Sequence, residues 1–220
     1  MPLPAIEIET APNPRHAVIW LHGLGADGHD FEPIVPELVD RSWPALRFVF
    51  PHAPVRPITI NGGMAMRAWY DISGMEIAQR QDEVGIRDSF RLLGDLIERE
   101  VARGIAAKDI LIAGFSQGGA IVLAGGLRYP QRLGGIIALS TYLPLAEKTD
   151  AEAERINHDV PVFMAHGMLD PTIPHALGEM SRDYLAQRGY PIDWHAYPMA
   201  HQVCAEEIAD LRNWMNARLR

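Results

Sequence analysis

The chain has 220 residues, of which 48% are apolar, so it can bury an extensive core without disulfides or a structural metal. Twenty basic and twenty-eight acidic residues give a formal net charge of −8, and no run of Lys or Arg is long enough to follow a phosphate backbone, so we expect no nucleic-acid partner. A lone cysteine, Cys204, excludes an intramolecular disulfide and fits a reducing compartment. No apolar stretch approaches the length of a membrane span, and we therefore expect a cytoplasmic protein without a stable membrane anchor.

Short apolar runs, each followed by a glycine or proline turn and then a helical pattern, recur along most of the chain. This alternation is typical of an α/β sheet. The middle runs are apolar at nearly every position, as parallel strands covered on both faces must be, whereas residues 5–9 alternate like a half-exposed edge. The sequence therefore predicts a single domain over residues 1–220, with a mostly parallel sheet and helices on both faces. The predicted strands are 5–9, 17–21, 46–50, 110–115, 135–139, 160–165 and 192–197.

Helical segments are predicted between these strands. From residue 82 to residue 103, apolar side chains recur at three- and four-residue steps and leave charged side chains for the solvent face. Similar stripes occur at 31–38, 177–185 and 208–219. We expect these stripes to face the core and assign them no chemistry.

One stretch, residues 51–81, interrupts the alternation with three prolines, paired glycines and several methionines, and it is too long for a plain connection. We predict that it is a substrate-loop insertion in which Met64, Met66 and Trp69 line a binding site, because unbranched methionine adapts to several ligand shapes. The alternative is a structural loop or a subunit contact. Exposed apolar side chains in this insertion would also permit a homodimer.

The hexapeptide GFSQGG, residues 114–119, directly follows an apolar strand and precedes a helical pattern that ends at Pro130. A serine between glycines at such a turn is how hydrolytic enzymes often present a nucleophile, because Gly114 and Gly118 let strand and helix approach closely. We therefore predict that Ser116 is a nucleophile. The alternative is a glycine-rich turn that opens an ordinary helix.

A serine hydroxyl needs a base to accept its proton and a carboxylate to orient that base. In an α/β-hydrolase these groups follow the serine in the order acid, then histidine, each after a later strand. Asp170 and His201 meet this requirement, whereas Asp159 precedes its strand and His195 lies within one. Ser116, Asp170 and His201 are the predicted triad.

The oxyanion of such a reaction requires two backbone N–H donors, one after the nucleophile and one after an early strand. Gln117 is the first candidate, and Leu24, between Gly23 and Gly25, is the second. The neighbouring His22 suggests a catalytic or metal-binding role, but its early position favours a histidine that supports the loop through hydrogen bonds. The nine histidines show no helical pairing and only one cysteine is present, so we expect neither a metal nor a cofactor.

Five motifs in order, LHGLGADGHDF, PHAPVRPITINGGMAMRAWYD, GFSQGG, HGMLDPTIP and MAHQVC, span residues 21–204 and closely resemble the phospholipase/carboxylesterase family, which includes bacterial carboxylesterases and acyl-protein thioesterases. The resemblance implies a small α/β-hydrolase without a separate cap domain. It implies the same triad, with Leu24 and Gln117 as oxyanion donors, and an acyl site around residues 64–71.

The resemblance also implies the hydrolysis of carboxylic esters. Arg67 stands where the eukaryotic thioesterases often have a proline, which favours a carboxylesterase acting on short- to medium-chain small-molecule esters. An acyl-protein or lysophospholipid-type (thio)esterase is the alternative. A catalytically silent binding module is the least favoured prediction, since all three triad residues are present.

Overall fold

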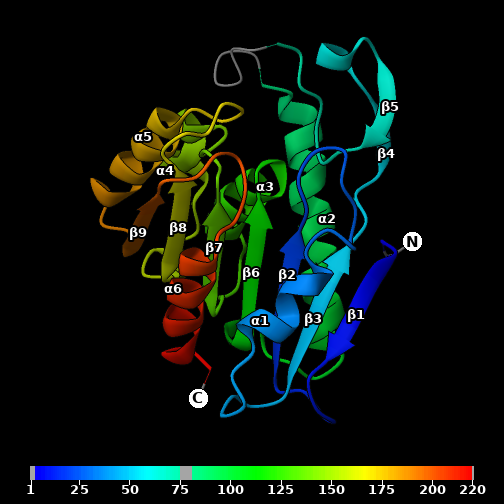
Figure 1. Ribbon diagram of the computed structural model, residues 1–220, viewed down its shortest axis with the longest axis vertical. Helices are drawn as coiled ribbons and strands as arrows, with labels where there is room; N and C mark the ends of the chain where they lie inside the picture. The colour runs from blue at the N-terminus through cyan, green and yellow to red at the C-terminus, as the bar shows by residue number, and fades with distance from the viewer. Residues whose placement is uncertain (1–2, 75–80, 220) are drawn as a thin grey trace.

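The computed structural model describes residues 3–74 and 81–219. A seven-stranded sheet with the order β1-β3-β2-β6-β7-β8-β9 forms the centre of this part of the molecule (Figure 1). β1 pairs with β3 in the antiparallel sense, and all other neighbours are parallel. The prediction of a mostly parallel α/β sheet of about seven strands is confirmed. The strands are β1 (Ala5–Glu9), β2 (His16–Leu21), β3 (Leu46–Pro51), β6 (Ile110–Phe115), β7 (Gly135–Leu139), β8 (Val162–Gly167) and β9 (Ile192–Tyr197).

The burial of the strands explains their composition. β2, β3, β7 and β8 are buried at every position, whereas the two edge strands, β1 and β9, are partly exposed. β8 begins at Val162, two residues later than predicted, and continues to Gly167. Proline has no backbone N–H to donate to a neighbouring strand, so Pro161 precedes the ladder.

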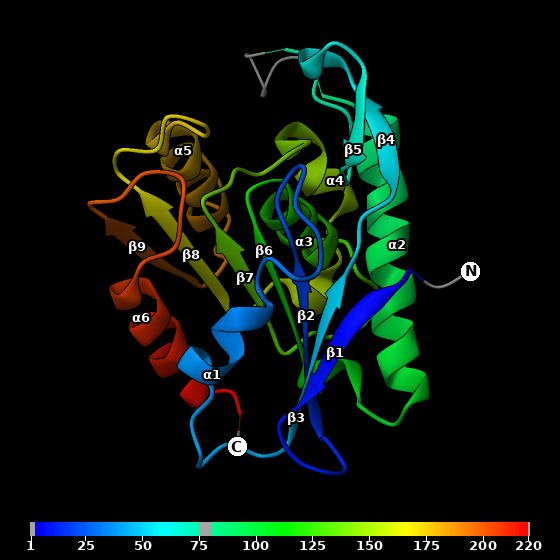
Figure 2. The same cartoon turned by 45° about the vertical axis from the view of Figure 1, so that its right-hand side comes forward.

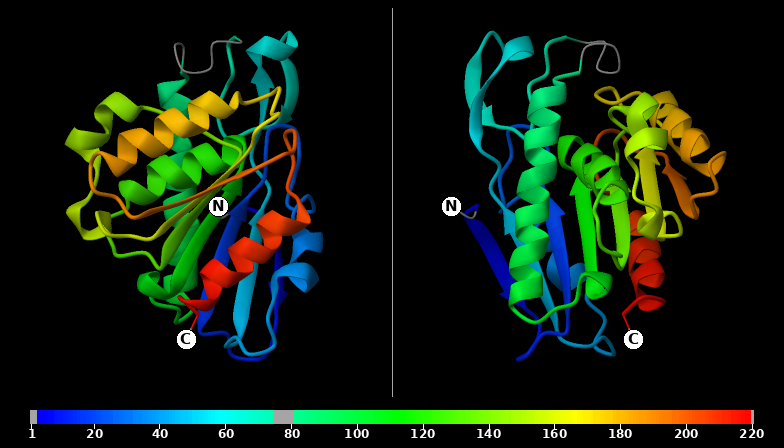
Figure 3. Two further views of the ribbon diagram at one scale, coloured as in Figure 1. Left: turned by 60° about the vertical axis from the view of Figure 1, so that its left-hand side comes forward. Right: turned by 180° about the vertical axis from the view of Figure 1, so that it is seen from behind.

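Helices cover both faces of the sheet (Figure 3). α2 (Glu83–Ala102), α3 (Gln117–Leu127), the short α4 (Thr149–Glu152) and α5 (His175–Ala186) lie on one face, and α1 (Val35–Leu38) and α6 (Ala205–Asn216) lie on the other. Each face has its own apolar cluster. β2 shows the division, because alternate side chains of a strand point to opposite faces: Ile19 joins the cluster under α2 and α3, and Trp20 joins the cluster under α1 and α6.

The predicted insertion is more regular than expected. It forms an antiparallel hairpin of β4 (Val55–Ile58) and β5 (Met64–Arg67), which projects beyond the carboxyl ends of the parallel strands (Figure 2). Gly62 and Gly63 have φ of 65° and 79°, a region open to glycine, and they permit the tight connection between the two strands. Residues 75–80 of the predicted insertion lie outside the described part.

Across the described ranges, no helix combines the length and the apolar composition needed to cross a membrane.

Candidate active site

Ser116 occupies the sharp turn between β6 and α3. Its φ of 55° and ψ of −119° are unusual for a residue with a side chain, and the conformation lifts the hydroxyl away from the strand. A Cβ on Gly118 would lie 2.3 Å from the carbonyl oxygen of Leu21, and one on Gly114 would lie 2.4 Å from the Gly118 backbone. The turn therefore requires glycine at both positions that flank the serine.

The structure brings Ser116, His201 and Asp170 into one chain of hydrogen bonds. His201 Nδ1 lies 2.6 Å from Asp170 Oδ2, and His201 Nε2 lies 2.9 Å from Ser116 Oγ. An ionised carboxylate only accepts hydrogen bonds, so the imidazole proton belongs on Nδ1. Nε2 is then free to accept the hydroxyl proton of Ser116, which is the arrangement that general-base activation needs.

The Asp170 carboxylate is held by its own loop after β8. Oδ1 accepts hydrogen bonds from the backbone N–H groups of Thr172 at 2.8 Å and Ile173 at 2.9 Å, which leaves Oδ2 directed at His201. Asp170 is only 7% exposed. This turn fixes the orientation of the carboxylate and, through it, of the imidazole.

A second histidine, His166, supports this loop and was missed by sequence reasoning. Its Nε2 donates to the carbonyl oxygen of Ile173 at 2.9 Å and lies 3.4 Å from Asp170 Oδ2. Burial lowers the pKa of His166, so the ring stays neutral at neutral pH. The only signal in the sequence is a histidine at the end of an apolar strand, four residues before the acid.

The His201 imidazole packs against an aromatic ring, which in turn packs against a second one. The Phe115 ring lies 4.7 Å from the imidazole, between centroids, and Phe31 lies 5.5 Å from Phe115. Phe115 is the last residue of β6, so the strand that presents the serine also packs against the base. This packing limits the rotation of the imidazole away from Ser116.

The loop after β2 lies against the serine. A Cβ on Gly23 would be 3.4 Å from Ser116 Cβ. Among the described residues, neither the N–H of Leu24 nor that of Gln117 donates a hydrogen bond. Two backbone donors beside a nucleophile are what an oxyanion hole consists of, so both remain candidates for that role.

His22 is the buried support of that loop. Its Nε2 accepts a hydrogen bond from the N–H of Ala53 at 3.1 Å, which places the proton on Nδ1, and Nδ1 donates to the carbonyl oxygen of Gly23 at 2.7 Å. Burial lowers the pKa of His22, which keeps the ring neutral. These contacts agree with a histidine that supports the loop.

The three predicted acyl-site residues differ in their exposure. Met64 is 64% exposed on the hairpin, and the Met66 sulfur packs over the loop after β2, where a Cβ on Gly25 would meet it at 3.8 Å. Trp69, in contrast, is 0% exposed and has no face left for an acyl chain. The expectation that Trp69 lines the site is therefore corrected, and the reason is that its side chain is part of the apolar cluster under α2 and α3.

Comparison with known proteins decides the family. Residues 3–219 match the sequence profile of the phospholipase/carboxylesterase family. The chain belongs to this family. The sequence-based predictions of the family, of a serine hydrolase and of the α/β-hydrolase fold are thereby confirmed.

Relatives of this family member extend over its full length. It is 40% identical to acyl-protein thioesterase 1 of Neurospora crassa, over 99% of this chain and 90% of the relative. It is 36% identical to acyl-protein thioesterase 1 of Yarrowia lipolytica, over 100% of this chain and 99% of the relative. The crystal structure of Arabidopsis thaliana SOBER1 aligns with a TM-score of 0.88 at 29% identity, over 94% of this chain and all of that one.

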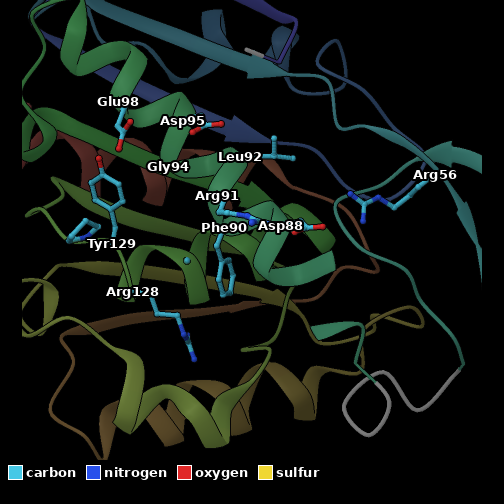
Figure 4. Close-up of a pocket in the computed structure, with 12 residues that line it drawn as sticks. Arg56, Asp88, Phe90, Arg91, Leu92, Gly94, Asp95, Glu98, Arg128 and Tyr129 are labelled. Atoms are coloured by element: carbon cyan, nitrogen blue, oxygen red, sulfur yellow. Dashed lines mark hydrogen bonds and ion pairs between the residues drawn. The ribbon is translucent and has the colours of Figure 1, made fainter. Parts of the chain in front are cut away.

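A large open pocket lies beside α2 and the end of α3, and Figure 4 shows the side chains that line it. It has a volume of about 720 Å³ and is lined by α2 and the end of α3, including Phe90, Arg91 and Arg128. Its lining includes none of the predicted site residues. Charged groups of both signs surround it, and we assign it no catalytic role.

Proposed function

We propose that the protein is a serine carboxylesterase that hydrolyses short- to medium-chain carboxylic esters through an acyl-enzyme intermediate. The observation that carries the proposal is the hydrogen-bonded chain from Ser116 Oγ through His201 to Asp170. Family membership supports the same reaction class.

In the first half of the proposed reaction, Ser116 Oγ attacks the ester carbonyl carbon while His201 Nε2 accepts the hydroxyl proton. Asp170 stabilises the imidazolium, and the N–H groups of Leu24 and Gln117 hold the oxyanion. Collapse of the tetrahedral intermediate breaks the bond to the leaving oxygen, which takes the proton from His201. The products of this half are an alcohol and acyl-Ser116.

In the second half, His201 removes a proton from water as the water oxygen attacks the acyl carbon. The second tetrahedral intermediate releases the carboxylic acid and returns the proton to Ser116 Oγ. Every proton is carried by the same imidazole nitrogen, so the reaction needs no cofactor.

Met66 and Met64 are proposed to form one wall of the acyl site. Met66 supports this role because it packs over the loop that holds Leu24, and Met64 extends the same strand of the hairpin. Apolar pockets discriminate by only about 1 to 3 kcal/mol per methylene, so we expect a broad preference for chain length.

A thioesterase activity is the second candidate, and it is favoured by the relatives that are named acyl-protein thioesterases. A thiolate leaves more easily than an alkoxide, and the same triad would serve both substrates. Turnover of an oxygen ester and its matched thioester decides between them.

We further propose that the protein acts in the cytoplasm, where the free Cys204 would stay reduced. The hairpin supports the proposal of a homodimer, since Val55 and Met64 are 62% and 64% exposed.

The test is a panel of p-nitrophenyl esters from acetate to laurate, with matched thioesters, assayed on the wild type and on Ser116→Ala. We expect the variant to keep its fold and to lose about 10⁴- to 10⁶-fold in kcat. A fluorophosphonate probe should label Ser116 in the wild type and leave the variant unlabelled. Labelling of a different serine, or full activity in the variant, would contradict the proposal.

A further inference from the structure

We infer that Trp69 is a positioning residue that links the two segments of the oxyanion hole and sets their separation across Ser116. The inference rests on the proposed acyl-transfer reaction and adds a role that neither the motif order nor the triad geometry assigns. In place of the expected contact with the acyl chain, Trp69 contacts the two segments that carry the predicted oxyanion donors.

The first link joins Trp69 to the helix that follows the nucleophile. The Gln117 side chain accepts a hydrogen bond from the N–H of Trp69 at 2.8 Å and donates one to the carbonyl oxygen of Tyr70 at 2.7 Å. Gln117 is 3% exposed, so water does not compete for these bonds. The residue that supplies one oxyanion donor is thus clamped to the backbone of the 69–70 segment.

The second link joins the Trp69 ring to the loop that supplies the other donor. The indole Nε1–H donates to the carbonyl oxygen of His22 at 2.9 Å, two residues before Leu24. The same segment continues the contact, because the carbonyl oxygen of Arg67 accepts from the N–H of Gly25 at 2.9 Å. Residues on both sides of the predicted donor, Leu24, are therefore hydrogen-bonded to Trp69 or Arg67.

The segment itself is anchored from outside. The hydroxyl of Ser89, on α2, donates to the carbonyl oxygen of Trp69, and Tyr70 shares a buried hydrogen bond of 2.9 Å with Tyr142. Trp69 is fully buried. The segment of residues 67–70 is thus bonded to α2, to the start of α3 and to the loop after β2, and has little freedom to shift.

An indole is the side chain that this geometry requires. The ring lies beside the His22 ring, with 5.5 Å between centroids, and its N–H satisfies a buried carbonyl oxygen that would otherwise lose its partner. An oxyanion hole acts through donors that are already in place when charge develops, so a displacement of Leu24 or Gln117 costs rate even when substrate still binds.

The experiment compares Trp69→Phe with Trp214→Phe. Trp214 is also buried, but its Nε1 has no acceptor in the described part of the chain, and it lies on α6 beneath the other face of the sheet. The pair therefore makes the same chemical change with and without the loss of a hydrogen bond. Active protein is counted by fluorophosphonate labelling of Ser116, so that kcat refers to folded enzyme.

For Trp69→Phe we expect kcat to fall about 10- to 100-fold at every acyl length, with KM within about threefold of the wild type. The affinity for a trifluoromethyl ketone, whose adduct with Ser116 carries an oxyanion, should fall by the same factor as kcat/KM. Trp214→Phe should change both quantities by less than about twofold.

Equal kinetics in the two variants would overturn the inference, and so would a Trp69→Phe loss confined to long or to short acyl chains, which would mark a wall of the acyl site. If Trp69→Phe does not fold, replacement of Trp69 by 3-benzothienylalanine keeps the bicyclic ring and puts sulfur in place of the N–H, with the same expected loss. A wild type that neither hydrolyses esters nor labels at Ser116 would refute the proposed function itself.

Discussion

Glu207 offers a sharp test of how burial sets stability in this protein. It lies in the first turn of α6, is 0% exposed, and neither carboxyl oxygen has a hydrogen-bond partner in the described part of the structure. Burial raises the pKa of Glu207 from 4.5 to about 8. The nearby backbone N–H of Cys204 lowers the pKa, but it forms no hydrogen bond with the carboxyl group, and burial is the larger effect. The side chain is therefore protonated at neutral pH.

The raised pKa makes stability depend on pH. The folded state keeps its proton up to about pH 8, whereas the unfolded chain loses it near pH 4.5, so unfolding releases a proton between these values. The contribution of Glu207 to stability is complete below pH 4.5 and is lost as pH rises to about 8. Because one pKa unit equals 1.36 kcal/mol, the loss amounts to about 4 to 5 kcal/mol.

Glu207→Gln replaces this carboxyl by a neutral amide of similar shape and removes the titration. We expect the unfolding free energy of the variant, relative to the wild type, to increase by about 4 kcal/mol between pH 4.5 and pH 9. Urea unfolding monitored by circular dichroism at several pH values measures this difference. Other titrating groups cancel because both proteins share them.

The matched control is Glu206→Gln, one residue earlier on the same helix, where the side chain is exposed. Its difference from the wild type should stay constant with pH to within about 0.5 kcal/mol. If the Glu207→Gln and wild-type curves ran parallel across the whole range, the carboxyl would not be protonated in the folded state and the argument from burial would be wrong.

The remaining predictions concern the site. Asp170→Asn should lower kcat about 10⁴-fold because the imidazole loses its orienting acceptor, whereas the exposed Asp159→Asn should leave steady-state kinetics nearly unchanged; the reverse ranking would require a different triad. Gly118→Ala should lower the melting temperature by more than about 5 °C, because its Cβ would lie 2.3 Å from a carbonyl oxygen of β2, and an unchanged melting curve would show that the turn between β6 and α3 tolerates a side chain at this position. Met66→Ala should alter the dependence of kcat/KM on acyl length, about tenfold between short and long esters, whereas Met180→Ala on α5 should preserve it; identical profiles would remove Met66 from the acyl site.

Much of this architecture follows from local pattern. Strands that are apolar at every position must be covered on both faces, so the sequence alone indicates a parallel sheet between helices. Parallel strands then bring their carboxyl ends to one edge, and Ser116, Asp170 and His201 each follow such a strand. Their proximity could therefore be expected from chain order, and the structure brings them within hydrogen-bonding distance.

The sequence pattern could not predict contacts between segments that are distant in the chain. A methionine-rich stretch with a tryptophan looks the same in the sequence whether the ring faces a ligand or the core. Only the structure shows that Trp69 is buried and hydrogen-bonded to His22 and Gln117. The role of His166 likewise depends on a loop that folds back over it. Periodicity reports which face of an element is apolar, but the partner of that face is set by tertiary packing, and it was packing that turned a predicted substrate contact into a structural link.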